Sequence, residues 1–293
     1  MPALEASGFE MIVQADPAAI PKSSFDLVVI DHYALDVDYE SLWRARAGKI
    51  LVLDDLANRA HDCDILVDQT FGRSPDDYKG LVLPGCALLC GSDYALLRPQ
   101  FFARRAESLQ RRTEGHIGRL LVNLGGSDPN RLTLTVLDSL KDISRPLTID
   151  IVVGASMMPH LHNEIVHRAR AMLQHETTVY AGVEDMAALM AKADLAIGAG
   201  GTTSWERCTL GLPSLLIEVA DNQHLIVQNL HKAGAATPLG LHTEVTPEII
   251  KNSLLYHLER PSVVLQMGQA AAAICDGLGT ARVVETIEKI CVS

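Results

Sequence analysis

A glycine-rich stretch at residues 194–206 carries the side chains and turn residues best suited to chemistry in this sequence. Its apolar start, residues 195–197, predicts a buried strand, and we expect a helix to begin near 202–204. A strand, a glycine turn and a helix start together present unpaired backbone N–H groups to an anion. An ordinary turn with a Ser/Thr cap is the alternative.

Individual residues of this stretch support the hypothesis that it binds an anion. Gly200 and Gly201 would let the backbone approach a phosphate closely, while Thr202 and Thr203 add hydroxyl donors. Glu206 falls in the first helical turn, where its carboxylate could accept a hydrogen bond from a ribose hydroxyl. The stretch is neither a dinucleotide fingerprint nor a Walker loop, because the sequence has no GxGxxG and no GK[ST].

Composition bounds the classes of protein and partner. The chain has 293 residues, of which 48% are hydrophobic and 21% charged, which is typical of one large or two ordinary globular α/β domains. The net charge of −11 and the lack of a basic patch argue against nucleic acid as a partner. An acidic chain can still hold a small anion in a local nest of N–H groups.

The cysteine and histidine patterns predict no metal and no cofactor. Six scattered cysteines without a CxxC pair indicate reduced thiols in a cytoplasmic protein. Cys86 and Cys90 have no matching Cys/His pair, and the histidines at 160, 162 and 167 lack accompanying carboxylates. We expect no membrane partner, because no apolar run reaches ~18 residues and no signal peptide opens the chain. The oligomeric state is not readable from the sequence.

The first half of the chain predicts a parallel α/β domain. Residues 1–7 resemble the end of a helix with a glycine cap at position 8, and residues 9–13 resemble a strand. Continuous apolar runs then predict strands at 25–30, 49–53, 65–67 and 87–89, with a helix at 38–47. A charged helix follows Leu97-Arg98-Pro99, and we place the domain boundary near 115, giving domains 1–115 and 116–293.

The second half repeats the pattern. Strands are predicted at 119–123, 148–153, 177–180, 195–197 and 214–219, with helices at 132–140, 160–174, 184–192, 203–210, from 223 to about 233, from about 246, and at 279–290. Ligands bind beyond the carboxyl ends of strands in open parallel sheets. The glycine loops at 125–127 and 198–203 should therefore face one edge, together with 31–33 and 222–223. Two ordinary βα turns are the alternative.

Six motifs in a fixed order carry a resemblance to a known family. They are Asp31-His32-Tyr33, Asp54-Asp-Leu-Ala-Asn-Arg59, Gly91-Ser-Asp-Tyr94-Ala-Leu-Leu-Arg98, Gly125-Gly-Ser-Asp128, Gly198-Ala-Gly-Gly-Thr-Thr-Ser-Trp-Glu206 and Asp221-Asn222-Gln223. From about residue 25 onward the chain resembles the pseudaminic-acid pathway UDP-sugar hydrolases (PseG), which are related to the MurG-type glycosyltransferases. The resemblance implies an α/β, GT-B-like fold of two Rossmann-like parallel-sheet domains, the first one N-terminally incomplete.

The resemblance also implies a reaction and a set of roles. Water would attack the anomeric carbon of UDP-2,4-diacetamido-2,4,6-trideoxy-β-L-altropyranose and break its C–O bond to UDP. Gly200, Gly201, Thr202 and Thr203 would hold the pyrophosphate through backbone N–H and hydroxyl donors. Glu206 would hold the ribose, and Gly126 and Ser127 would line the opposite wall. Tyr33 and Asn222 resemble active-site residues of the family.

The sequence departs from the family at its start. Members of the family open with a Gly-x-Gly-His-x-x-Arg loop whose histidine is the general base, and this sequence has no such motif. We expect the first strand-helix-strand-helix portion of the domain, and with it the base, to be absent from the chain. His32 should neighbour the site or bond to the backbone rather than act as the base. Two alternatives remain, namely a GT-B glycosyltransferase using a UDP-sugar donor and a non-catalytic UDP-binding remnant.

Overall fold

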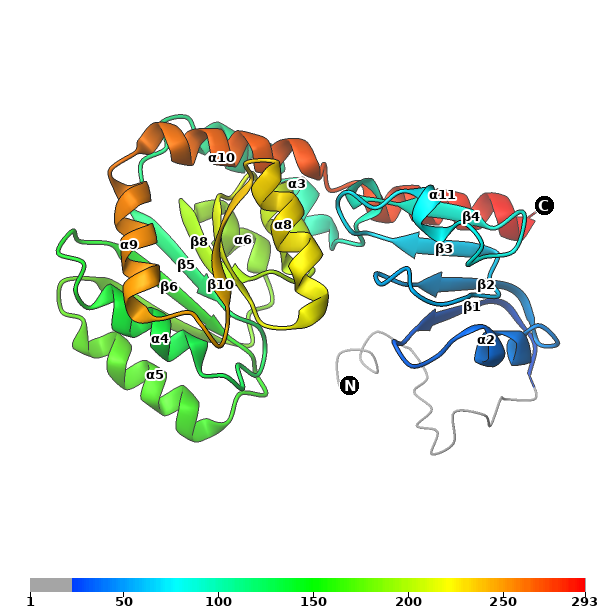
Figure 1. The fold of residues 1–293 in the computed structure, drawn as a ribbon. Coiled ribbons are helices and arrows are strands. Elements are labelled where there is room, and N and C mark those ends of the chain that lie inside the picture. The colour runs from blue at the N-terminus through cyan, green and yellow to red at the C-terminus, as the bar shows by residue number, and fades with distance from the viewer. Residues whose placement is uncertain (1–22, 293) are drawn as a thin grey trace. The chain divides into compact units, whose positions relative to one another are not determined.

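The computed structural model describes residues 23–292, which form two compact units (Figure 1). The smaller unit comprises the described residues within 1–68, 75–89 and 285–293, and the larger unit comprises 69–74 and 90–284. The helix end expected at 1–7 and the strand expected at 9–13 lie outside the described residues. Every strand predicted between residues 25 and 219 is present.

The smaller unit is built on a four-stranded sheet of order β1-β2-β3-β4, in which β2 pairs in parallel with β1 and with β3. Helix α2 ends at Trp43, earlier than the predicted end at 47, because Ala47 pairs with Phe25 and already belongs to a strand. The elements of this unit are β1 (Phe25–Asp31), α2 (Val37–Trp43), β2 (Ala47–Leu53), β3 (Ile65–Asp68), η1 (Pro75–Tyr78) and β4 (Ala87–Cys90).

The larger unit is a six-stranded parallel sheet of order β10-β9-β8-β5-β6-β7. From β5 the chain adds β6 and β7 on one side and then crosses back to add β8, β9 and β10 on the other. The elements are η2 (Ser92–Tyr94), α3 (Pro99–Arg111), β5 (Arg119–Asn123), α4 (Leu132–Leu140), β6 (Thr148–Val153), α5 (Pro159–Ala171), β7 (Glu176–Ala181), α6 (Met186–Lys192), β8 (Leu195–Ala199), α7 (Thr203–Thr209), β9 (Ser214–Glu218), η3 (Asp221–Gln223), α8 (His224–Lys232), β10 (Ala236–Leu241), α9 (Pro247–Leu258), α10 (Pro261–Ile274) and α11 (Gly279–Val292), whose last residues are assigned to the smaller unit.

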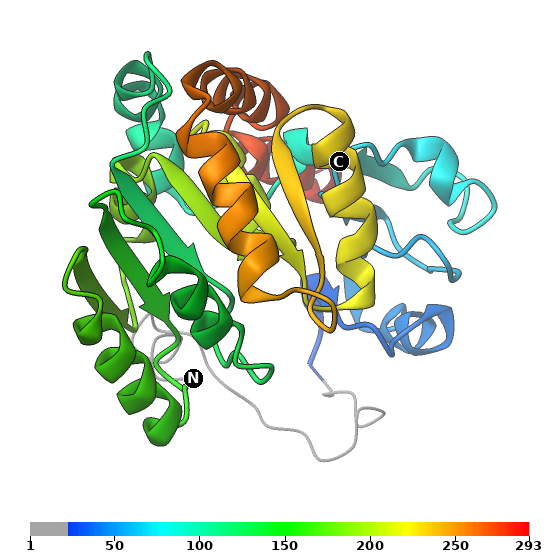
Figure 2. The same ribbon diagram turned by 60° about the vertical axis from the view of Figure 1, so that its left-hand side comes forward.

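Helices cover both faces of this sheet (Figure 2). Leu120 and Val122 of β5 pack into a core with α4, α5 and α9, whereas Leu121 packs into a second core with α3, α6, α7, α8 and α10. Both cores are apolar because successive strand side chains point to opposite faces and both faces are covered. The continuous apolar runs of the sequence therefore correctly predicted parallel strands with two covered faces.

One strand and one α-helix were not predicted from the sequence, and the division into two units differs from the predicted boundary. Strand β10 contains Pro238 and Gly240, which argue against a strand but are tolerated at the edge of a sheet, and α10 was not predicted. Helix α3 belongs to the larger unit, where the Ser108 hydroxyl donates to the Leu210 carbonyl at 2.7 Å and Arg105 donates to the Ala272 carbonyl at 2.7 Å. The structural division thus does not coincide with the boundary predicted near 115.

Candidate functional site

Two glycine loops leave the larger sheet at the point where its strand order reverses. Strands β5 and β8 are parallel neighbours whose register ends at Asn123↔Gly198, and β9 lies on the far side of β8. The loops after β5 and β8, and η3 after β9, therefore share one edge of the sheet, as predicted. This reversal is the place where open α/β sheets bind ligands.

The loop after β8 offers three amide groups to a ligand. The structure gives the N–H groups of Gly201, Thr202 and Thr203 no acceptor within the described residues. The N–H of Gly200 differs from the expectation, because it donates to the Ile217 carbonyl at 3.1 Å and extends the sheet by one residue. Gly200 is needed for space instead, since a Cβ there would lie 2.3 Å from Cγ2 of Val227.

A buried arginine supports this loop from inside the fold. Arg207 on α7 is 2% exposed, and its Nη2 donates to the Ala199 carbonyl at 2.7 Å and to Oγ of Ser204 at 3.0 Å. Its Nη1 lies 3.4 Å from Oγ1 of Thr203. Burial lowers the pKa of Arg207 to about 10, so the guanidinium is charged at neutral pH.

The loop after β5 is fixed by its own aspartate and by the neighbouring strand. Asp128 is buried, and its carboxylate accepts hydrogen bonds from the amides of Leu132 and Thr133 at 2.9 Å each, which caps α4. A Cβ on Gly154, just past β6, would lie 2.0 Å from the Gly126 carbonyl oxygen, so only glycine fits there. Gly126 and Ser127 are exposed.

A pocket of about 320 Å³ joins the two loops. Three of the predicted site residues line it, namely Gly126, Thr203 and Glu206. Ser127, Gly200, Gly201, Thr202 and Asn222 are not among its lining residues. Sequence reasoning did not assign Arg98, Asn123, Gly154, Gly182, Val183 and Met186 to the site, although they also line the pocket. Position 98 had one signal, a basic residue directly before a helix-starting proline.

Two arginine charges act on the Glu206 carboxylate. Burial raises the pKa of Glu206, and the charges of Arg98 and Arg207 oppose that rise. Arg98 itself donates to the Glu184 carbonyl at 3.0 Å and lies over the Phe101 ring. The pocket therefore combines a partly buried carboxylate with nearby positive charge, as a ligand with both hydroxyl and anionic groups would require.

Asn222 and Gln223 both lie in η3, directly after β9. Asn222 is exposed in η3. Gln223 is tied down, because its Oε1 accepts the Val219 amide at 3.0 Å, and its Nε2 would lie 3.4 Å from a Cβ on Gly201. Gln223, which the prediction did not single out, is thus the residue of η3 that packs against the glycine loop.

The predicted sugar-side residue lies in the smaller unit. Tyr33 is 58% exposed just past β1, and its hydroxyl donates to Oδ2 of Asp55 at 3.1 Å. Burial raises the pKa of Asp55, the Tyr33 hydrogen bond lowers it, and the neighbouring Asp68 and Asp54 charges raise it further. His32 bonds to the backbone, as predicted, because its Nδ1 accepts the Ala34 amide at 3.1 Å.

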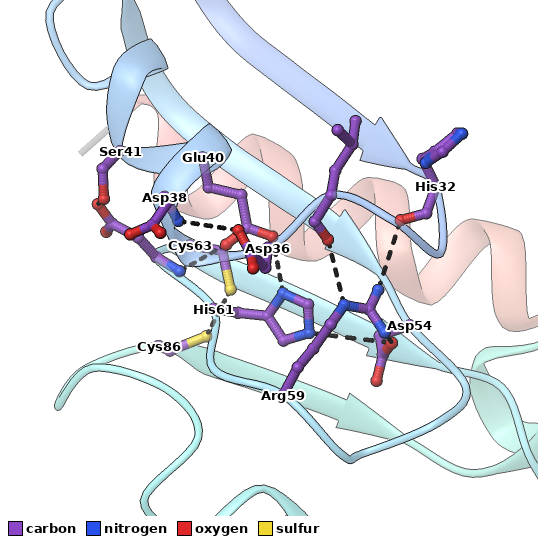
Figure 3. Close-up of polar contacts among 12 residues, drawn as sticks. His32, Asp36, Asp38, Glu40, Ser41, Asp54, Arg59, His61, Cys63 and Cys86 are labelled. Atoms are coloured by element: carbon purple, nitrogen blue, oxygen red, sulfur yellow. Dashed lines mark hydrogen bonds and ion pairs between the residues drawn. The ribbon is translucent and has the colours of Figure 1, made fainter. Parts of the chain in front are cut away.

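The smaller unit also contains a buried polar network around His61 and Asp54 (Figure 3). His61 Nδ1 is 2.7 Å from Oε1 of Glu40, and its Nε2 is 3.8 Å from Oδ1 of Asp54. Asp54 also pairs with Arg59 at 2.7 Å and accepts the Tyr78 hydroxyl at 2.8 Å. The motif at 54–59 was recognised in the sequence, but the partners of Asp54 come from distant positions and carry no local signal.

Within residues 23–292, no group of three or more His, Cys, Asp or Glu side chains is arranged to hold a metal ion. None of the helices in that range is both long enough and apolar enough to cross a lipid bilayer.

Comparison with known proteins identifies relatives of both sequence and fold. The chain is 31% identical over 166 residues to the UDP-2,4-diacetamido-2,4,6-trideoxy-beta-L-altropyranose hydrolase of Campylobacter jejuni, covering 54% of this chain and 56% of that protein. It is 31% identical over 207 residues to the spore coat polysaccharide biosynthesis protein SpsG of Bacillus subtilis, covering 68% of this chain and 58% of that one. The chain thus spans about half the length of the curated relatives that it matches.

The fold comparison agrees with the predicted architecture. The crystal structure of Acinetobacter baumannii MurG superposes with a TM-score of 0.67 at 18% identity, covering 90% of this chain and 73% of that one. The predicted α/β, GT-B-like pair of Rossmann-like domains is confirmed. Residues 120–281, which include both glycine loops, match the model of the glycosyltransferase family 28 C-terminal domain, and the chain therefore belongs to that family.

Proposed function

We propose that this protein is a hydrolase that removes UDP from a UDP-linked diacetamido-trideoxy-hexose. Water attacks the anomeric carbon, the C–O bond to UDP breaks, and the free sugar becomes available for nonulosonic acid synthesis. One observation carries the nucleotide part of this proposal. The open amides at 201–203 lie at the strand-order reversal, and Thr203 and Glu206 line the same pocket. The similarity to the C. jejuni hydrolase supports the choice of reaction.

The proposed roles follow from the charge that develops on the leaving group. UDP gains negative charge as the C–O bond breaks, and fixed N–H dipoles and hydroxyl donors stabilise that charge without reorganisation. Gly201, Thr202 and Thr203 supply these donors, with Gly200 as the spacer that brings the loop close. Glu206 accepts the ribose hydroxyls, and Gly126 and Ser127 form the opposite wall.

The sugar-side roles fall on Tyr33 and Asn222. Tyr33 presents an exposed phenol whose orientation is set by its hydrogen bond to Asp55. Asn222 is exposed beside the loop edge and is proposed to position the water or a sugar hydroxyl. In this proposal the larger unit binds the nucleotide. The six unbridged cysteines favour a reducing compartment such as the cytoplasm.

A glycosyltransferase that passes the sugar to an acceptor is the second candidate. The family match favours it, because the domain model that covers residues 120–281 is that of a glycosyltransferase. Leaving-group stabilisation by the loop would serve both reactions, so the two differ only in the nucleophile.

One pair of assays separates these functions. The UDP-sugar is incubated with the protein in the absence and presence of candidate acceptors, and free sugar and UDP are quantified. Release of free sugar without an acceptor is the expected result, and release that depends on an acceptor would establish the transferase instead. Calorimetry with UDP runs in parallel. Binding without any turnover would identify a non-catalytic UDP-binding protein and overturn the proposal.

A further inference from the structure

Arg207 keeps a full charge inside the fold without a counter-ion. Of its guanidinium nitrogens, the two terminal ones contact the glycine loop, and Nε is buried without an acceptor. Among the described residues, no carboxylate lies within ion-pair distance of it. Burying a cation without a partner is costly, because the interior replaces the solvation of the charge only in part. Burial lowers the pKa of Arg207 and outweighs the charges of Cys208 and, to a lesser degree, Glu206, which raise that pKa without an ion-pair contact.

The guanidinium is also fixed in place. A Cβ on Gly198 would lie 2.6 Å from Nη1 of Arg207 and 3.0 Å from the Asn123 carbonyl oxygen, so glycine at 198 makes room for the charged group. Ala199 and Ser204 hold Nη2 through hydrogen bonds. The Arg207 guanidinium is therefore a fixed positive charge that supports the glycine loop carrying the open amides.

The hydrogen bonds have a direction that matters for a ligand. Arg207 donates to Oγ1 of Thr203 and to Oγ of Ser204, so each hydroxyl oxygen acts as an acceptor there and keeps its own proton to donate elsewhere. A hydroxyl polarised by a cation is a stronger donor toward a phosphate oxygen. Thr203 lines the pocket, which makes its hydroxyl the nearer of the two to a ligand.

We propose that Arg207 is a positioning residue for the ligand's diphosphate, which serves as the missing counter-ion of this buried guanidinium. Arg207 does not touch the ligand. It acts through its hydrogen bond to Thr203 and through the positive electrostatic potential that it creates at the amides of 201–203. This inference rests on the proposed nucleotide site and goes beyond it, because it predicts that the diphosphate, rather than the uridine part, depends on Arg207.

The test compares two ligands that differ only in the diphosphate. Calorimetry measures the affinities of UDP and uridine for the wild type, Arg207→Met and Arg207→Lys. In Arg207→Met the preference for UDP over uridine falls by ~10-fold or more, the order expected for a unit charge acting across a protein interior, while uridine affinity is unchanged. Arg207→Lys keeps the charge but not the planar fork, and it retains part of the preference.

Arg112 provides the matched control. It is another arginine of the larger unit whose pKa burial lowers to about 10, but it donates to the carbonyls of Met190 and Ala193 at 2.7 Å each, before β8 begins. Arg112→Met should affect folding stability and leave the ratio of UDP to uridine affinity unchanged. A general effect of removing a buried arginine would lower the ratio in both variants and would overturn the proposal.

Arg207→Gln keeps the inference testable if Arg207→Met does not fold. The glutamine amide retains a hydrogen-bond donor, whereas the positive charge is gone. The preference for UDP over uridine should fall in Arg207→Gln as in Arg207→Met, and a preference equal to that of the wild type contradicts the inference.

Failure of the proposed nucleotide site and failure of the proposed role of Arg207 give different results. If the wild type binds UDP no better than uridine, the proposed nucleotide site itself is wrong. If the wild type prefers UDP and that preference survives in Arg207→Met, the site stands and the role of Arg207 does not.

Discussion

Replacing Glu206 tests the nucleotide site most directly. Glu206 is the acidic side chain lining the pocket, alongside Gly126 and Thr203. In the proposed complex its carboxylate accepts the ribose hydroxyls. Removing a hydrogen bond to a charged group costs about 1.5–3 kcal/mol, and Glu206→Ala should therefore weaken UDP binding by about 10- to 150-fold. Glu206→Gln keeps one acceptor oxygen but loses the charge, so its loss should be smaller, about 1 kcal/mol.

The same substitution has an opposite effect on the ligand-free protein. Burial raises the pKa of Glu206, so the folded state holds the proton more tightly than the unfolded chain. The ionised carboxylate therefore costs stability at neutral pH, and that cost declines as the pH falls from the raised pKa of the folded state to the ordinary pKa of the unfolded chain. Glu206→Gln should melt at a higher temperature than the wild type near pH 7, with the difference vanishing in acid.

The assay is calorimetry with UDP and with 2′,3′-dideoxy-UDP, which has no ribose hydroxyls to offer. Wild type and Glu206→Ala should bind the dideoxy ligand equally, because the interaction is already absent from it. Glu176→Ala, an exposed carboxylate at the start of β7 and so at the opposite edge of the sheet, serves as the control. Equal weakening of both ligands by Glu206→Ala, or no weakening at all, would refute the placement of the ribose.

Three further predictions concern the loops and the smaller unit. Gly154→Ala places a methyl group 2.0 Å from the Gly126 carbonyl oxygen, so it should displace that loop, lower stability by about 1–3 kcal/mol and weaken UDP binding, as melting curves and calorimetry would report. Tyr78→Phe removes a buried hydroxyl whose oxygen lies 2.8 Å from Oδ2 of Asp54 and 2.9 Å from Oδ2 of Asp68, which share its single proton. Denaturant titration should register a loss of about 2–4 kcal/mol, whereas an unchanged midpoint would mean that the network is not formed. The Sγ atoms of Cys63 and Cys86 lie 3.6 Å apart, so oxidised glutathione should convert the two thiols to a disulfide and release reduced glutathione. Mass spectrometry after thiol blocking should show that the peptide pair has lost two hydrogens. The Cys86→Ser variant should show no such loss.

The candidate site illustrates where sequence reasoning succeeds and where it stops. The two glycine loops were found because each follows an apolar run, and their common edge follows from parallel strands. Glu206 was found because it lies one helical turn beyond the second loop. Gly200 was assigned as an amide donor, which is wrong in detail, since whether its N–H joins the sheet depends on how far the pairing with β9 extends.

Other site residues had no local signal to follow. Gly154 and Gly182 reach the pocket from two separate segments, and only the packing of the larger unit brings them together. Likewise, Glu40 and His61 form a buried pair although 21 residues separate them in the chain. A buried ion or polar group is stable only with partners, and the identity of those partners depends on tertiary contacts.

The sequence by itself determined the class of fold, the order of the strands from β1 to β9 along the chain, and the two turns that hold the candidate site. These features depend on short-range patterns of apolar residues and glycines, which the chain expresses locally. The tertiary structure alone decided that β5 and β8 are neighbours, that α3 packs on the larger unit, and that Arg207 is buried behind the loop without a counter-ion. Strand order and burial arise from long-range packing, where each residue's environment is set by segments that the local sequence does not specify.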